Sequence, residues 1–174
     1  MFTDDRQFPA PLAAVAAVAL DYDDGAGVDF EPYAAFLPAE ETAEWFRAWT
    51  GNRELNGDAF RVFGQDGAGG YTAFWLARQN RALADQPIVF LGSEGETGVV
   101  ARDLGGFLWL LADGFGPCEA VDPQEHGRAA RPHQELAAIA EQFAPDQRQP
   151  AAAVTELATR EFPDFENSIM QLCR

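Results

Sequence analysis

The fold is decided by residues 60–101, FRVFGQDGAGGYTAFWLARQNRALADQPIVFLGSEGETGVVA. Runs of β-branched and aromatic residues alternate there with glycine-bearing connections, a pattern typical of antiparallel hairpins. The first hairpin is predicted to join a strand that begins at Phe60 to YTAFWLA (71–77), and the second to join PIVFLG (87–92) to TGVVA (97–101). The glycines expected to build the first turn are Gly64, Gly67, Gly69 and Gly70. The wholly apolar run Ile88–Leu91 predicts a central strand that is covered on both faces.

A helix is predicted on each side of this stretch. After Pro38, the run AEETAEWFRAWT has acids in its first turn, apolar positions at helical spacing and Gly51 at its end. We interpret that apolar stripe as core. Asp103 is predicted to cap a second helix, LGGFLWLLADG (104–114). The two glycines of its first turn, at 105 and 106, are expected to allow close packing against the sheet.

Strands in the middle with helices before and after them predict an α+β fold. We expect a central, mostly antiparallel sheet of about four to six strands, with flanking helices and a C-terminal helical extension. Residues 1–117 would form the sheet-containing core with its acidic N-terminal segment. Residues 118–174 would form proline-bounded helices that dock on the same domain.

The N-terminal region has a weaker pattern. Leu12–Val18 is compatible with a short helix or with the start of a strand. Apolar residues alternate over Val18–Tyr22 and again at Val28 and Phe30, on either side of the sequence DDGAG. This pattern predicts another β-hairpin.

The chain is strongly acidic, with 28 Asp and Glu residues against 12 basic residues, all of them Arg, and a formal net charge of −16. Ten of the acids lie in residues 1–44, where Arg6 is the one basic residue. Such a field repels nucleic acid and anionic lipid and attracts basic proteins. A coat that keeps the protein in solution is the alternative interpretation of the same charge.

Several functional classes are disfavoured by what the sequence lacks. The longest apolar stretch near the start, Pro11–Leu20, is too short to span a membrane, and acids precede it where a signal peptide needs positive charge. Cys118 and Cys173 form no disulfide framework or metal motif, although one bridge between them stays open. We therefore expect a cytoplasmic protein.

No catalytic, cofactor or metal site is expected. The segment Gly64–Gly70 cannot be a phosphate loop, because the chain contains no Lys and a strand follows the glycines. Ser93 lacks the spacing of a nucleophile elbow, because Gly92 directly precedes it. The two histidines, His126 and His133, match no zinc spacing. A hydrolase with a non-standard carboxylate site would need acids gathered in a cleft with raised pKa values.

Binding is the remaining class. Acids at turns would steer a basic partner, and Trp49 or Trp75 could anchor it, although all four tryptophans also fit the core. The residues predicted to contact a partner are Asp23, Asp24, Trp49, Asp66, Glu94 and Glu96.

The order of these features resembles the SUKH superfamily, which is named partly for a yeast cell-wall regulator and is abundant in bacterial toxin loci. The likeness covers 37–117: a Leu-Pro opening a Trp-bearing helix, the glycine turn of 64–70, the aromatic strand of 71–75, the hairpin around Glu94-Gly95-Glu96 and the Phe/Leu helix of 107–111. It implies an α+β fold and an immunity protein that binds and blocks a toxin, often a nuclease. It supplies no catalytic residues. A regulatory or adaptor module, as in the yeast relative, is the alternative.

Overall fold

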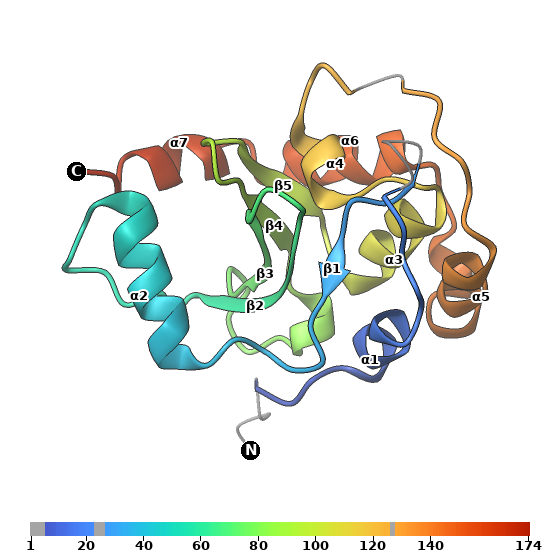
Figure 1. The fold of residues 1–174 in the computed structure, drawn as a ribbon, viewed down its shortest axis with the longest axis horizontal. Helices are drawn as coiled ribbons and strands as arrows, with labels where there is room; N and C mark the ends of the chain where they lie inside the picture. Colours follow the sequence, from blue (N-terminus) through green and yellow to red (C-terminus); the bar gives the residue numbers. More distant parts are fainter. Residues whose placement is uncertain (1–5, 23–26, 126–127) are drawn as a thin grey trace.

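The computed structural model describes residues 6–22, 27–125 and 128–174, and these residues form one five-stranded antiparallel sheet with helices on both sides (Figure 1). The strands follow one another in the sheet in sequence order: β1 (Glu31–Pro32), β2 (Phe60–Gln65), β3 (Tyr71–Trp75), β4 (Ile88–Leu91) and β5 (Thr97–Ala101). The predicted α+β class and the antiparallel sheet are confirmed.

Two helical layers enclose the sheet. In Figure 1, α2 (Ala39–Thr50) and α7 (Phe165–Met170) lie to its left, and α1 (Ala10–Ala16), α3 (Leu104–Ala112) and α5 (Gln134–Phe143) to its right. Two further helices, α4 (Pro117–Val121) and α6 (Ala151–Glu161), pack against β5, the last strand of the sheet. The short 3-10 turns η2 (Leu83–Asp85) and η3 (Pro145–Gln147) complete the connections.

Strand β4 lies between the two cores. Ile88 and Phe90 belong to the core on the α3 side, whereas Val89 and Leu91 belong to the core on the α2 side. All four side chains are fully buried, so the predicted central strand is confirmed. Side chains of a strand alternate between faces, so one short apolar strand stabilises both helical layers.

The two predicted hairpins are confirmed, because β2 pairs with β3 and β4 with β5. In the first turn the Asp66 N–H donates to the Gly70 carbonyl at 3.0 Å. Gly69 has the positive φ of 89° that glycine adopts readily. The prediction for Gly64 was wrong: it lies within β2, where a Cβ would stand 2.4 Å from the Phe30 ring.

The helices that flank the hairpins also begin and end as predicted. Helix α2 starts after Pro38 and ends at Gly51, which has a φ of 67°. Asp103 Oδ1 accepts a hydrogen bond from the Gly106 N–H at 2.8 Å, and this caps α3. The reason expected for the first-turn glycine at 105 was wrong, because a Cβ there would meet the Gln147 side chain at 2.4 Å rather than the sheet.

The predicted N-terminal hairpin is wrong. Residues 10–16 form α1, and the described parts of 18–30 contain no strand. Val28 and Phe30 are buried in the core on the α3 side, so their alternation reflects a segment outside the sheet that faces the core. The strand that does form here, β1, is two residues long and includes Pro32, which lacks the N–H that a longer ladder needs.

The C-terminal helices share the cores of the sheet. Leu136 and Val154 are buried in the core on the α3 side, and Ala158, Phe165 and Ile169 in the core on the α2 side. The helices after residue 117 are therefore docked on the sheet through apolar contacts. Among the described residues, no helix has the length and apolar character needed to cross a membrane.

Candidate functional site

One end of the sheet brings together most of the residues predicted to contact a partner. In this antiparallel order, the β2–β3 turn (66–70) and the β4–β5 turn (92–96) lie at the same end. Trp49 reaches it from α2, because its indole Nε1–H donates to the Gly92 carbonyl at 2.8 Å. Asp66, Glu94 and Glu96 are in the two turns, whereas Asp23 and Asp24 lie outside the described residues.

Asp66 has a structural role in its turn. Its side chain is buried, with the residue 4% exposed, and Oδ1 accepts hydrogen bonds from the N–H groups of Ala68 at 3.0 Å and Gly70 at 2.7 Å. Burial raises its pKa, although the Gly70 hydrogen bond acts in the opposite direction. A partner could not reach this carboxylate in the observed conformation.

The two glutamates of the second turn differ in exposure. Glu94 is exposed at the tip, where a partner can reach it. Glu96 is half-buried, and its Oε2 accepts a hydrogen bond from the Glu94 N–H at 3.3 Å. Glu94 is therefore the more accessible carboxylate of the pair.

Four further acids lie at this end, and the sequence did not predict that they would contact a partner. Asp29 Oδ1 accepts a hydrogen bond from the Gly67 N–H at 2.9 Å, which fastens the N-terminal segment to the first turn. Glu119, Asp122 and Glu125 come from α4 and the residues after it. Together with the acids of the turns they form what we call the acidic end: Asp29, Asp66, Glu94, Glu96, Glu119, Asp122 and Glu125.

A cleft of about 350 Å³ opens at the acidic end. Arg128 is the one basic residue among its described lining residues, which are Tyr22, Asp29, Cys118, Glu119, Asp122, Glu125 and Arg128. Its guanidinium lies 3.6 Å from Glu119 Oε1 and 3.5 Å from Glu125 Oε2, both long for charge-assisted hydrogen bonds. The cleft thus carries more negative than positive charge.

Glu119 is the most enclosed acid of the cleft. The residue is 8% exposed, and its Oε2 accepts no hydrogen bond from the part of the chain that the structure describes. Burial raises the pKa of Glu119 above its ordinary value, more than the Arg128 charge lowers it. A buried carboxylate oxygen without a donor costs stability, so Glu119 destabilises the free protein.

Cys118 is a poor nucleophile in these surroundings. Burial, together with the negative charges of Asp66 and Glu119, raises the pKa of its thiol to about 12. Because the thiolate is the reactive form, the raised pKa lowers the reactivity of this thiol near neutral pH. Cys118 and Cys173 are both free, so the bridge left open by the sequence does not form.

The described residues do not form the carboxylate cleft that the hydrolase alternative requires. His133 Nδ1 accepts the Leu136 N–H at 3.4 Å as the cap of α5, Ser93 is exposed in its turn, and His126 is outside the described residues. Asp66 is engaged by its own turn, so the three turn carboxylates share no open cleft. Within 6–22, 27–125 and 128–174, no group of three His, Cys, Asp or Glu residues is placed to hold a metal ion.

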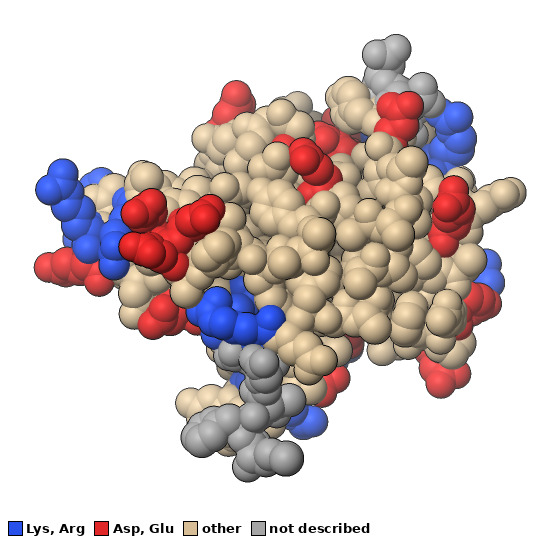
Figure 2. All heavy atoms as spheres, turned by 60° about the horizontal axis from the view of Figure 1, so that its bottom comes forward, with Lys and Arg blue, Asp and Glu red and all other residues tan. Residues whose placement is uncertain are grey.

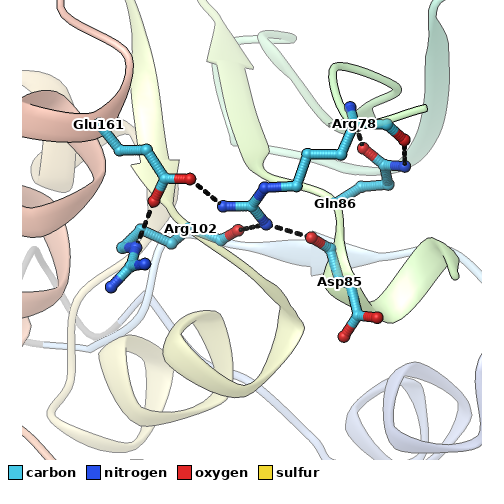
Figure 3. Close-up of polar contacts among 5 residues, drawn as sticks. All are labelled: Arg78, Asp85, Gln86, Arg102 and Glu161. Carbon is cyan, nitrogen blue, oxygen red and sulfur yellow. Dashed lines mark hydrogen bonds and ion pairs between the residues drawn. The ribbon is translucent and has the colours of Figure 1, made fainter. Parts of the chain in front are cut away.

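The opposite end of the sheet has a different character (Figure 3). There the Glu161 carboxylate accepts hydrogen bonds from both Arg78 and Arg102, and Arg78 Nη1 also donates to the Arg102 carbonyl at 2.9 Å. The Gln86 side chain accepts a hydrogen bond from the Arg78 N–H and donates one to the Arg78 carbonyl. The Asp85 carbonyl accepts a hydrogen bond from the Arg78 guanidinium. We call this set, Arg78, Asp85, Gln86, Arg102 and Glu161, the arginine end.

The charge of the rest of the surface is uneven. Figure 2 shows a broad face whose centre is nearly free of charged side chains, with acids and arginines gathered around it.

Comparison of the chain with protein-family models, curated proteins and solved structures gives no match. The sequence pattern and the geometry of the acidic end are therefore the observations that bear on function.

Proposed function

We propose that this chain is a bacterial immunity protein that binds a basic toxin, such as a nuclease, and blocks it by contact at the acidic end. The observation that carries the proposal is the excess of acids there: of the seven carboxylates of the acidic end, four line a cleft whose described lining includes one arginine. The resemblance to the SUKH superfamily is consistent with this function. The toxin would be met in the cytoplasm of the producing cell.

Uncompensated acids at one site are better explained by a partner than by folding. Like charges placed close together, and a buried carboxylate oxygen that lacks a donor, both reduce the stability of the free protein. A basic partner would supply positive charge close to the exposed carboxylates. With a net charge of −16, the chain would also accelerate its encounter with such a partner.

Trp49 adds an apolar contact beside these charges. It is half-buried, and the hydrogen bond from its indole to the Gly92 carbonyl fixes the ring next to the turn that carries Glu94. An aromatic side chain that is already held in place loses little entropy on binding, and such residues often dominate interface energetics.

The test is co-expression with the product of the adjacent gene. The proposal expects that neighbour to be toxic, the chain to restore growth, and the purified pair to associate more slowly as salt rises. A non-toxic neighbour, or a toxic one that the chain neither binds nor neutralises, would overturn it. A salt-independent association rate would remove the role of the acidic end while leaving neutralisation intact.

A further inference from the structure

Four aromatic side chains lie in a continuous row on the α2 side of the sheet, and we call them the aromatic stripe: Tyr33, Tyr71, Trp45 and Trp49. In that order, the centroids of neighbouring rings lie 6.5, 4.7 and 6.3 Å apart. All four pack against the core on the α2 side, and all four are half-buried rather than buried. The row reaches the acidic end, because Tyr71 directly follows the first turn and Trp49 donates to Gly92 in the second. Each residue of the stripe therefore has surface that a partner can contact.

Hydrogen bonds inside the chain hold the Tyr33 end of the stripe beside a carboxylate. The Tyr33 hydroxyl donates to Gln65 Oε1 at 2.8 Å, and Gln65 Nε2 donates to Glu31 Oε2 at 3.0 Å. Burial, the neighbouring Tyr71 and the negative charge of Glu31 raise the pKa of Tyr33 to about 12. Glu31 is exposed, so a carboxylate within reach of a partner borders this end of the stripe.

Glutamates also border the tryptophans of the stripe. On α2, Glu41 precedes Trp45 by four residues, so the two side chains are neighbours on one face of the helix. Trp49 follows four residues later, and its hydrogen bond to Gly92 places it next to the turn that carries Glu94. Both Glu41 and Glu94 are exposed. Since an aromatic ring has negative potential over its faces, the rings and the carboxylates together favour a cation.

The arginine end shows what a ring beside a carboxylate binds in this molecule. The Arg78 guanidinium lies 5.4 Å from the Phe162 ring centroid and also donates to the Glu161 carboxylate. Two further arginines of the described residues lie over aromatic rings, and these pairs are Arg128 over Phe115 and Arg148 over Trp109. None of these three rings belongs to the stripe. A guanidinium is therefore the cation that this chain itself pairs with rings, and the stripe offers the same combination to another molecule.

We propose that the aromatic stripe binds an arginine side chain of the basic partner, with the guanidinium stacked on a ring and a bordering glutamate as its hydrogen-bond acceptor. A guanidinium suits both groups, because it is planar, stacks on aromatic faces and matches a carboxylate with two donors. A lysine ammonium would pair with the glutamates but is a compact, strongly hydrated charge that cannot stack. The inference rests on the proposed function for the identity of the partner, whereas the preference for arginine is a property of the stripe itself.

The experiment uses the full chain and three blocked pentapeptides in which glycine alternates with arginine, with lysine or with citrulline, the uncharged analogue of arginine. Binding is followed by NMR titration at low salt, with the indole N–H signals of Trp45 and Trp49 reporting on the stripe. We expect saturable shifts of both signals, with the arginine peptide bound about tenfold more tightly than the citrulline peptide and a few-fold more tightly than the lysine peptide. Equal affinities for the arginine and citrulline peptides, or shifts at the acidic cleft that leave both indoles unmoved, would overturn the proposal.

Two pairs of variants locate the site. Trp45→Leu removes a central ring and should weaken the arginine peptide about fivefold, whereas Phe143→Leu, at an exposed ring of α5 outside the stripe, should not. Glu41→Lys places a positive charge beside Trp45 at an exposed position and should weaken the same peptide by a similar factor, whereas Glu135→Lys on α5 should weaken it less than about twofold. Unchanged binding in Glu41→Lys would contradict the assignment even if Trp45→Leu did not fold.

The same variants separate this inference from the proposed function. If the chain neutralises the product of the adjacent gene, and Trp45→Leu and Glu41→Lys bind that toxin as tightly as the wild type does, the inference fails and the proposed function stands. If the arginine peptide binds at the stripe but the chain neutralises no neighbour, the proposed function fails and the arginine preference of the stripe stands.

Discussion

Glu161 and Glu119 are both glutamates of helices that pack against β5, yet they lie in opposite electrostatic surroundings. Two arginines hold the Glu161 carboxylate, and their hydrogen bonds lower its pKa although its partial burial acts in the other direction. Burial raises the pKa of Glu119, and the nearest arginine lies too far away for a short hydrogen bond. The arginine end therefore stabilises the fold, whereas the acidic end holds a buried carboxylate oxygen that accepts no hydrogen bond from the described residues.

The largest effect is expected from breaking the arginine end with Arg78→Ala. This change removes hydrogen bonds to the Glu161 carboxylate and to the Asp85 and Arg102 carbonyls, as well as the stacking of the guanidinium 5.4 Å from the Phe162 ring centroid. The free energy of unfolding in urea should fall by about 2 kcal/mol. Arg81→Ala, at an exposed position nearby, is the control and should change it by less than about 0.5 kcal/mol. Equal losses in the two variants would mean that the network contributes nothing.

Replacing Glu119 or Glu161 by Gln should change the free energy of unfolding in opposite directions. Glu119→Gln removes a buried charge and should raise the free energy of unfolding at pH 7 by about 1 kcal/mol. Glu161→Gln removes a partly exposed charge held by two arginines and should lower it by about 1 kcal/mol or less, because solvent screens the pair. Urea unfolding of both variants measures the difference. Changes of the same sign would abolish the distinction between the ends.

The pH dependence of stability should also differ between the Glu119 and Glu161 variants. The folded pKa of Glu119 is raised, so its contribution to stability is full below the unfolded pKa, near 4.5, and is lost as pH rises through the folded pKa. The folded pKa of Glu161 is lowered, so its contribution is present above that unfolded value and is lost as pH falls through the folded pKa. The stability advantage of Glu119→Gln over the wild type should thus shrink from pH 7 to pH 4, while the deficit of Glu161→Gln should shrink only in stronger acid. Urea unfolding at several pH values tests this, and an advantage of Glu119→Gln that grows in acid would contradict it.

The smallest effect on stability is expected from Glu94→Gln. This side chain is exposed at the tip of its turn, so the free energy of unfolding should change by less than about 0.5 kcal/mol. The rate of association with a basic partner should nevertheless fall by a few-fold, because a charge that faces the partner has been removed. Stopped-flow mixing with the neutralised toxin measures the rate, and Glu135→Gln, exposed on α5, is the matched control. An equal fall in both variants would show that net charge matters and its position does not.

Much of the fold could be predicted because its signals are local. The glycine turns, the apolar run of β4, the Asp103 cap and the end of α2 at Gly51 each depend on residues close together in the sequence. The conformation of the N-terminal segment could not be predicted, because alternation at Val28 and Phe30 arises equally from a strand and from a segment outside the sheet that faces the core.

The candidate site was predicted in part for the same reason. Glu94 and Glu96 belong to a recognisable turn, and the structure places them at the acidic end. Asp66 was found for its position in a turn, but the burial of its carboxylate depends on hydrogen bonds that a sequence does not show. Glu119 and Asp29 reach the site only through tertiary packing, and the one local signal was an acid in the first turn of the helix that Pro117 begins.

The most direct test of the account is hydrogen exchange of the chain, alone and bound to the protein whose toxicity it neutralises. The account predicts new protection in 92–96 and 117–125, the exposed turn and the helix of the acidic end, with the segment around Arg78 and Arg102 unchanged. Protection confined to the arginine end, or to α5, would contradict it.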